Sequence, residues 1–498
     1  MVSTMMTAGR EIRQALNRAA DAVLVLSADG SVVRTGAELL ERAECLAGAL
    51  VDLGLEHGVV GLSYRNSAAA LEAFIATELI GATRLPVEPS AAPAEARAIY
   101  EAGGARVVVT DDDHNDVPAT DPRIPRSSPL SDATLVHTVD RPLEGPRRRA
   151  DTWVEASTPL VVYPRAVRGG ELFGIPTSYA NWRSIIRINR ALYESGGYGP
   201  TLGQDECYLT VVQLMHATGM VGSFPFLHLG LPQVMLPRFN AAAAIEAIRR
   251  HQVTTAFVVP GMLTRIADHL ERAGAADSAE RSLPSLRRVL YGGAPVEPDA
   301  LRRLIGVFGP ALCQLYGRYE AGWPLTVLSG LDHDGVLRGD TEIVGSCGRP
   351  IDQVEIELHP VPGTASSCEI RTRNAMVSPS FADPDGWCSL GDTAVRTPRG
   401  YLHLTGRLDG MINTGSFHVY PDEVRDALLA LSGVSDALVV GVPDPVWGEA
   451  VTAYVVTDEP VTADALRGQL KRRLATYKVP TAVHVVDDLV EATNRRSR

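Results

Sequence analysis

The chain has 498 residues, of which 45% are hydrophobic and 21% are charged, and its formal net charge is −12. A chain this long is expected to form two or more domains, and its net negative charge argues against a nucleic-acid or anionic-membrane ligand. The N-terminal residues lack the apolar core of a signal peptide, and no apolar run reaches the roughly 18 residues of a membrane span. A cytoplasmic location without membrane contact is therefore expected.

Lysine is almost absent. Only Lys471 and Lys478 occur, so 45 of the 47 basic residues are arginine. Arginine-biased codon usage in a GC-rich genome accounts for most of this depletion. The six cysteines are scattered and form no C-x-x-C pair, so they indicate neither a zinc site nor a redox motif.

The first third of the chain alternates predicted helices and strands. Helices are expected at 37–54 and 68–80, and strands at 59–63 and 106–110. This alternation predicts an α/β sheet with helices on its faces. Residues 113–150 are polar and rich in Asp, Pro and Arg, which predicts a long surface connection.

The alternation resumes at about residue 161 and continues to about residue 316, with a helix at 241–250 and a strand at 253–259. Short strands with many Gly, Pro and Asp turns then predict a small β-barrel or a twisted β-subdomain at about 335–405. Beyond residues 406–410, Pro421 suits the first turn of a helix. The elements expected there are helices at 422–431 and 463–474 and strands at 437–442 and 450–456.

Together these patterns predict an α/β fold with two domains. The N-terminal domain, residues 1–405, is expected to contain packed, mostly parallel sheets with helices, and the β-rich subdomain lies at its end. Residues 406–498 are expected to form a compact α+β domain.

Several short motifs follow one another along the chain. They are Arg65-Asn66-Ser67, GATRLP at 81–86, Tyr291-Gly292-Gly293-Ala294-Pro295, YGRYE at 316–320, Leu390-Gly391-Asp392, Gly406-Arg407, VYPDEV at 419–424 and GVPDPVWGE at 441–449. In this order they resemble the adenylate-forming superfamily of acyl-CoA synthetases, peptide-synthetase adenylation domains and luciferase-like ligases, from about residue 35 to about residue 485. The resemblance implies activation of a carboxylic acid with ATP to an acyl-AMP, followed by transfer to a thiol or an amine.

The resemblance also implies an adenosine site, formed by Gly292, Gly293, Ala294, Tyr316, Asp392 and Arg407. The two glycines leave space for a flat base against the backbone. Asp392 matches the carboxylate that accepts hydrogen bonds from the ribose hydroxyls, and Arg407 matches its partner at the domain boundary.

Three further residues have counterparts in the superfamily. Glu320 fits a Mg²⁺-ligating catalytic position, because Mg²⁺ selects carboxylate oxygen near phosphates. His216 matches a catalytic residue that flanks the acyl pocket. Residues 213–219 around it contain no acidic side chain to pair with a substrate ammonium, which favours an aryl, alkyl or short hydroxy acid without an α-amine. Asp409 fits the hinge about which a mobile C-terminal domain rotates.

The phosphate-binding segment departs from the superfamily pattern. That segment is normally rich in Ser, Thr and Gly and carries a lysine. The corresponding residues 163–174, YPRAVRGGELFG, contain no Ser or Thr, and Phe173 stands at the position of the lysine. Arg165 and Arg168 are the candidates to replace the lost charge, since arginine is a capable phosphate ligand.

The catalytic lysine of the C-terminal domain is also missing. The chain ends LVEATNRRSR, without the Gly or Lys of that motif, and Arg495 is the candidate catalytic substitute. Lys478 matches a different family segment. The residues that depart from the superfamily pattern are those expected around the triphosphate and the α-phosphate, whereas the residues expected around the adenosine and the acyl group match the pattern better.

Three functions fit this pattern. The first is an ATP-dependent acid–thiol or amide ligase that uses ATP/AMP and Mg²⁺, with CoA, phosphopantetheine on a carrier protein, or an amine as the acceptor. The second is acyl transfer from a preformed acyl-adenylate or thioester without ATP, and the third is a non-catalytic binding protein. Pyrophosphate exchange with a panel of acids separates them, and Phe173→Lys together with a restored C-terminal Gly-Lys motif is expected to raise exchange.

Overall fold

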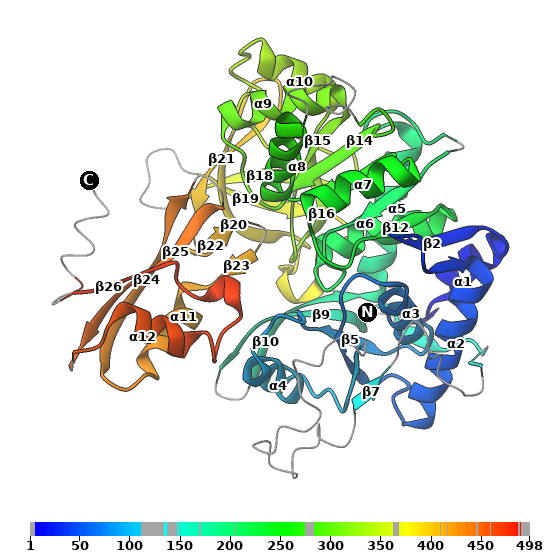
Figure 1. Cartoon of the computed structure of the whole chain (residues 1–498), viewed down its shortest axis with the longest axis horizontal. Coiled ribbons are helices and arrows are strands. Elements are labelled where there is room, and N and C mark those ends of the chain that lie inside the picture. Colours follow the sequence, from blue (N-terminus) through cyan, green and yellow to red (C-terminus); the bar gives the residue numbers. More distant parts are fainter. Residues whose placement is uncertain are drawn as a thin grey trace.

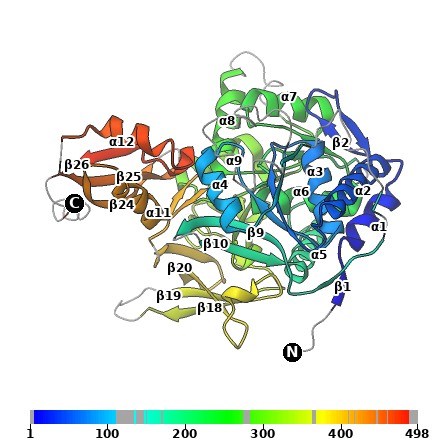
Figure 2. The same ribbon diagram turned by 90° about the horizontal axis from the view of Figure 1, so that it is seen from below.

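The computed structural model describes residues 5–110, 134–136, 147–148, 150–168, 171–203, 205–273, 283–361, 368–408, 410–415, 417–444, 447–458, 460–486 and 489, with residues 134–136, 168, 273 and 418 described by their backbone alone. The chain forms a large N-terminal domain and a separate small C-terminal domain, drawn in orange to red (Figure 1). Seen from below, the small domain projects from one end of the large one (Figure 2). Most of the predicted surface connection at 113–150 lies outside the described residues.

The largest sheet of the N-terminal domain has nine strands. In spatial order these are β17 (Arg349–Pro350), β16 (Gly322–Leu328), β15 (Leu312–Arg318), β14 (Arg288–Gly292), β13 (Thr255–Val258), β11 (Tyr208–Thr210), β12 (Gln233–Met235), β2 (Val23–Ser27) and β3 (Val33–Thr35). Neighbouring strands from β15 to β2 are parallel. The outer pairs β17–β16, β16–β15 and β2–β3 are antiparallel. The motif residues Gly292 and Tyr316 lie at or near the carboxyl ends of adjacent parallel strands, where sheets of this kind bind ligands.

A second sheet of six strands lies beside it. Its order is β10 (Glu171–Ser178), β9 (Pro159–Arg168), β5 (Thr83–Pro86), β4 (Val59–Ser63), β6 (Val107–Thr110) and β7 (Thr134–Val136). All of its pairs are parallel except β9 with β10. A short antiparallel pair joins β1 (Met5–Thr7) to β8 (Trp153–Glu155).

Helices connect these strands and cover the sheets. The helices of the N-terminal domain are α1 (Arg10–Arg18), α2 (Gly36–Asp52), α3 (Ala68–Leu79), α4 (Pro93–Ala102), α5 (Tyr179–Ser195), α6 (Ala217–Leu229), α7 (Ala241–His251), α8 (Pro260–Ala273), α9 (Pro298–Phe308) and α10 (Gly330–Leu337). Every residue of α3 and all but Leu229 of α6 are buried, which explains why neither helix has a polar face. Phe74 of α3 meets Phe224 of α6 with 6.1 Å between ring centroids, so these helices join the two sheets.

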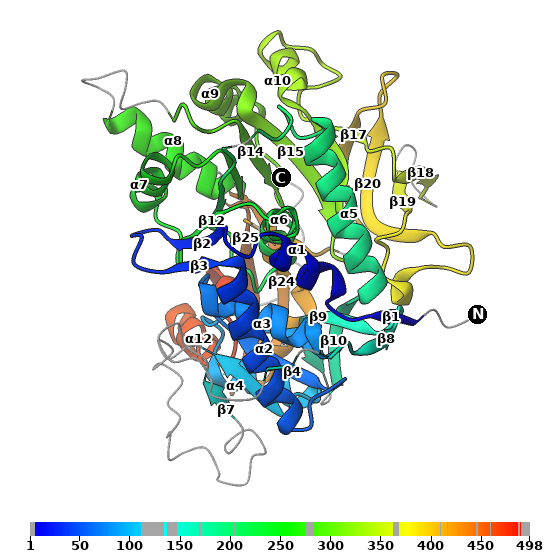
Figure 3. The same ribbon diagram turned by 90° about the vertical axis from the view of Figure 1, so that its right-hand side faces the viewer.

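The β-rich region is a four-stranded antiparallel sheet. Its order is β18 (Glu355–Pro360), β19 (Cys368–Arg373), β20 (Cys388–Arg396) and β21 (Leu402–Arg407). Within the described residues it is an open twisted sheet, so of the two predicted alternatives the structure has no barrel here. Helix α5 lies beside it (Figure 3), and Asn181 of α5 donates to Val377 O at 2.9 Å.

The C-terminal domain has its own sheet and its own core. The sheet order is β23 (Phe417–Val419), β22 (Ile412–Thr414), β25 (Gly448–Thr457) and β24 (Val434–Asp444), with β26 (Ala482–Val485) parallel to β25. Helices α11 (Pro421–Leu429) and α12 (Ala463–Leu470) pack on it through buried Val424, Leu428 and Leu466. A membrane crossing needs a longer and more apolar helix than any found in the described part of the chain.

Candidate functional site

The residues predicted for the ribose lie together at the edge of the four-stranded sheet. Antiparallel pairing of β20 and β21 places Asp392 opposite Arg407. Asp392 Oδ1 accepts a hydrogen bond from Arg407, and Oδ2 accepts one from the hydroxyl of Tyr316 at 2.6 Å. Burial, together with the Asp392 charge, raises the pKa of Tyr316 well above its usual value, so the phenol stays a donor. The Asp392 carboxylate is thereby fixed in orientation.

The predicted base-binding turn follows β14. A Cβ added at Gly292 would lie 2.2 Å from Leu315 O, so contact with the neighbouring strand is enough to require glycine there. Gly293 has a φ of 89°, in the left-handed region that favours glycine, and Ala294 follows, partly buried. Asn413 of the C-terminal domain donates from Nδ2 to Gly293 O at 3.0 Å, so the small domain covers this turn.

The segment aligned with the phosphate loop forms a β-hairpin. Phe173 on β10 pairs with Ala166 on β9, and Leu172 pairs with Val167. The Phe173 side chain is 50% exposed and lies on the edge strand of the sheet. Backbone groups that are paired in a strand ladder cannot wrap around a triphosphate as the amides of an open loop do. The side chain of Arg168 lies outside the described residues.

The side chain of Arg165, on β9, extends from this hairpin to Glu320, the predicted metal position. Its Nη2 donates to Glu320 Oε1 at 2.6 Å, and its guanidinium carbon lies 4.8 Å from the ring centroid of Tyr420. Burial lowers the pKa of Arg165, and the neighbouring Glu320 opposes that effect. Arg318 Nε lies 3.5 Å from Glu320 Oε2 and 3.8 Å from Asp392 Oδ2. A chain of alternating charges therefore links the hairpin to the ribose residues.

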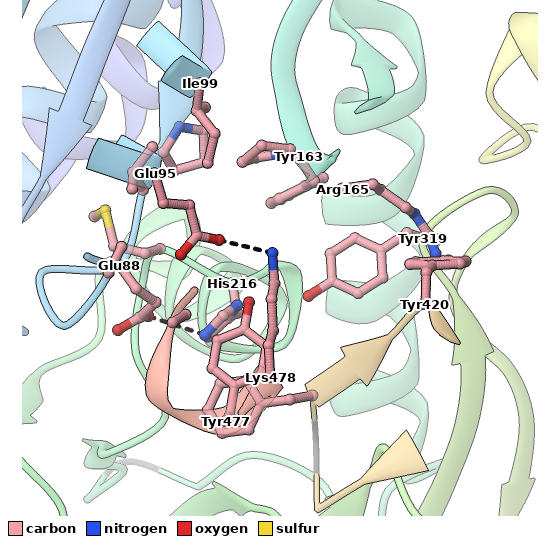
Figure 4. A pocket seen from close by; sticks show the side chains of 17 residues that line it. Glu88, Glu95, Ile99, Tyr163, Arg165, His216, Tyr319, Tyr420, Tyr477 and Lys478 are labelled. Atoms are coloured by element: carbon pink, nitrogen blue, oxygen red, sulfur yellow. Dashed lines mark hydrogen bonds and ion pairs between the residues drawn. The ribbon is translucent and has the colours of Figure 1, made fainter. Parts of the chain in front are cut away.

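A cavity of about 90 Å³ lies between the two domains beside Arg165 (Figure 4). Its walls come from both domains: Pro86, Val87, Glu88, Ala91, Glu95, Ile99, Tyr163, Pro164, Arg165, Met215, His216 and Tyr319 from the large domain, and Phe417, Tyr420, Ala475, Tyr477 and Lys478 from the small one. Tyr319 packs edge-on against Tyr163 with 4.9 Å between ring centroids. Burial raises the pKa of Tyr319 to about 12.

His216 is at the start of α6 and faces this cavity (Figure 4). Its Nε2 lies 2.9 Å from Glu88 Oε1, and its ring packs edge-on against Phe417 at 5.3 Å. Glu88 follows β5, far from His216 in the sequence. A carboxylate therefore reaches the cavity from outside residues 213–219, which the inspection of that stretch alone could not reveal.

Lys478 closes the other side of the cavity. Its Nζ donates to Glu95 Oε1 of α4 and to Glu423 Oε1 of α11, each at 2.7 Å. Burial by itself lowers the pKa of Lys478, but the charges of Tyr477, Glu423 and Glu95 outweigh burial and raise the pKa above its usual value. This lysine is thus a charged contact between the domains.

Two of the predicted site residues have no described position in the structure. Asp409 and Arg495 lie outside the described residues. Among the described ones, no three His, Cys, Asp or Glu side chains come together in a way that could hold a metal ion.

The family of the chain follows from comparison with known proteins. The AMP-binding enzyme family matches residues 12–163 and 174–365, and the AMP-binding enzyme C-terminal domain matches residues 423–496. The chain belongs to the AMP-binding enzyme family, which confirms the predicted resemblance. The two matched stretches are separated by residues 164–173, which belong to the segment aligned with the phosphate loop.

Individual relatives agree with this assignment. The medium/long-chain-fatty-acid–CoA ligase FadD8 of Mycobacterium tuberculosis is 33% identical over 301 residues, covering 57% of this chain and 51% of that protein. Feruloyl-CoA synthase of Amycolatopsis is 36% identical over 306 residues, covering 58% of this chain and 59% of that protein. The chain thus spans less than two thirds of the length of these curated relatives.

A solved structure matches nearly the whole chain. The amide bond synthetase McbA from Marinactinospora thermotolerans superimposes with a TM-score of 0.80 at 26% identity, covering 97% of this chain and 96% of that one. This match confirms the predicted α/β fold with a large N-terminal and a small C-terminal domain.

Proposed function

We propose that this protein is an AMP-forming ligase that activates a carboxylic acid as its acyl-adenylate and passes the acyl group to a thiol or an amine. The observation that carries the proposal is Asp392, which Tyr316 and Arg407 hold in a fixed orientation near a cavity that contains His216. The similarity to CoA ligases and to an amide bond synthetase supports the same class of reaction.

In this proposal the two halves of the site have separate tasks. Asp392 binds the ribose, and the turn Gly292–Ala294 receives the base. The substrate carboxylate attacks the α-phosphorus of ATP and pyrophosphate leaves; the acceptor then attacks the acyl carbonyl and AMP leaves. Arg165 and Arg318 supply positive charge for the phosphate, and closure of the small domain excludes water from the adenylate.

The acyl group is proposed to lie in the cavity beside His216. An acid without an α-amine is proposed because residues 213–219 contain no acidic side chain and the Glu88 carboxylate of the cavity lies 2.9 Å from the His216 ring. CoA, phosphopantetheine on a carrier protein, or an amine remain the proposed acceptors. The division into residues 1–405 and 406–498, the hinge at Asp409 and the role of Arg495 also remain predictions.

A second function is favoured by the β9–β10 hairpin. The described part of residues 163–174 forms a paired strand ladder and no open phosphate loop, as expected for an enzyme that takes a preformed acyl-adenylate or thioester.

The experiment that tests the proposal is ATP–pyrophosphate exchange with a panel of aryl, alkyl and hydroxy acids, followed by product detection with CoA and with primary amines. Exchange that is lost in Asp392→Asn supports the ligase. Product from supplied acyl-AMP without exchange supports the second function. If wild type gives neither exchange nor product, both proposals fail.

A further inference from the structure

The predicted magnesium position is occupied by protein cations. Glu320 Oε1 accepts from Arg165 at 2.6 Å, and Glu320 Oε2 lies 3.5 Å from Arg318 Nε. Mg²⁺ requires oxygen ligands at about 2.0–2.1 Å in octahedral geometry. The Glu320 carboxylate lies between two guanidinium groups that already balance its charge, and these cations would repel a divalent cation. The residues at Glu320 do not fit Mg²⁺.

The Arg165 side chain is held beside Glu320 by burial and by two aromatic rings. Its side chain is 14% exposed, and its guanidinium carbon lies 5.9 Å from the ring centroid of Tyr319 and 4.8 Å from that of Tyr420. Aromatic faces stabilise a guanidinium group while leaving its N–H donors free to point in plane. One ring belongs to the large domain and the other to the small domain, so Arg165 is held in place when the domains are closed.

The local charges match a singly charged ligand. Arg165, Arg318 and Arg407 contribute three positive charges, and Glu320 and Asp392 contribute two negative ones, which leaves one net positive charge. The phosphodiester of an acyl-adenylate carries one negative charge.

We infer that Arg165 takes the place of Mg²⁺ in this protein, so that the adenylate phosphate is bound without a metal ion. The inference rests on the proposed function only in taking an adenylate as the ligand. It adds that Arg165 sets the charge of the site and that adenylate binding is independent of divalent cations.

The test uses the full-length protein and the methyl ester of AMP, a phosphodiester with one negative charge. Calorimetric titration in EDTA and in MgCl₂ is expected to give dissociation constants within about twofold of each other. Arg165→Met is expected to weaken binding in EDTA by about tenfold to a hundredfold, the range for losing a charged hydrogen bond. Adding Mg²⁺ to this variant is expected to restore part of the affinity, because Glu320 is then open on one side.

Arg371 provides a matched control. It is also partly buried, pairs with Asp383 and lies over the ring of Trp387 at 5.8 Å, but it is outside the charge chain. Arg371→Met should therefore bind the ester as wild type does. Thermal unfolding of both variants checks that each is folded.

Three results would overturn the inference: wild-type binding that tightens tenfold or more with Mg²⁺, wild-type affinity in Arg165→Met in EDTA, or no binding by wild type in either buffer. Failure of the proposed function is distinguishable. Metal-independent binding of the ester without exchange or transfer would remove the ligase proposal and leave the role of Arg165 intact.

Discussion

The two halves of the site are built by different means. On the adenosine side, strand pairing fixes the residues: Asp392 stands opposite Arg407 in a ladder, and Gly292 is pressed against the strand that carries Leu315. On the proposed phosphate side, the described residues aligned with the phosphate loop form the β9–β10 hairpin, and long side chains from distant elements meet in the closed space between two domains.

This difference explains why the residues of the phosphate side can be substituted more easily than those of the adenosine side. The register of the strands allows only one position of the sheet to place a side chain at a given point, whereas a charge carried on a long side chain can be replaced by another side chain that reaches the same point. Recognition of the nucleoside and handling of the phosphates can therefore diverge within one fold. Five predictions test this contrast, from the largest effect to the smallest.

The adenosine side should be the more sensitive. Asp392→Asn keeps the size of the side chain and removes its charge, which weakens the hydrogen bonds proposed to hold both ribose hydroxyls. At about 1.5 kcal/mol for each of the two bonds, the lower end of the range for a charged hydrogen bond, affinity for the AMP methyl ester should fall by about 100-fold to 200-fold. Calorimetry measures this loss. Asp383→Asn is the control, because Asp383 pairs with Arg371 and not with the residues around Asp392. A loss below tenfold would contradict the assignment of Asp392.

Closure of the phosphate side should depend on Lys478. Lys478→Met leaves Glu95 and Glu423 facing each other without a cation, and domain opening rehydrates them. The closed arrangement should weaken by about 2–3 kcal/mol, less than the 3–5 kcal/mol of a fully buried broken pair. Small-angle X-ray scattering should show a larger radius of gyration, whereas Lys471→Met, at an exposed position, should not change it. An unchanged radius in Lys478→Met would argue against the contact.

The two lysines also allow a chemical test of closure in the wild type. An amine-reactive ester should label Lys471 at least about tenfold faster than Lys478, because Lys478 is buried and its pKa is raised. A raised folded pKa means that the stabilising charge is fully present below the ordinary lysine pKa of about 10.4 and is lost only at still higher pH. Mass spectrometry of peptides should therefore show Lys478 protected up to about pH 10. Equal labelling at pH 8 would contradict this.

A smaller effect is expected where the small domain covers the base-binding turn. Asn413→Ala removes one neutral hydrogen bond, to Gly293 O, worth about 1 kcal/mol. Affinity for the AMP methyl ester should fall about fivefold, with the thermal midpoint nearly unchanged. A hundredfold loss would mean that Asn413 contacts the ligand itself.

The smallest effect is expected at Phe173, which aligns with the lysine of the superfamily's phosphate loop. Phe173→Lys alone places an ammonium group on a half-exposed edge strand, while the backbone remains paired in the hairpin. The ratio of ATP to AMP affinity should change by less than about twofold, since a single exposed charge contributes little. A tenfold gain for ATP would show that the hairpin opens to receive a triphosphate.

Much of the fold was predictable from the sequence. The strand predicted at 59–63 is β4, and the helices predicted at 68–80 and 241–250 are α3 and α7 to within a residue. The helix predicted at 463–474 is shorter, because α12 ends at Leu470. These elements are encoded by apolar periodicity over a few turns, which is a local property.

The candidate site was predictable only in part. Asp392, Arg407 and Tyr316 were predicted from the motifs that contain them, and the structure brings the three side chains together. Residue types alone align residues 163–174 with a loop, whereas the pairing of β9 with β10 depends on backbone geometry that residue types do not show. Glu88, Glu95 and Phe417 lie outside every motif that was singled out.

The sequence by itself determined the family, the alternation of helices and strands, and the loss of lysine from the phosphate segment. The tertiary structure decided what replaced it: Arg165 meets Glu320 across 155 residues, and Lys478 meets Glu95 across 383. Helix and strand formation depend on neighbours along the chain, so a sequence displays them. Charge pairs between long side chains depend on where separate elements end in space, and only the folded packing of two domains sets that.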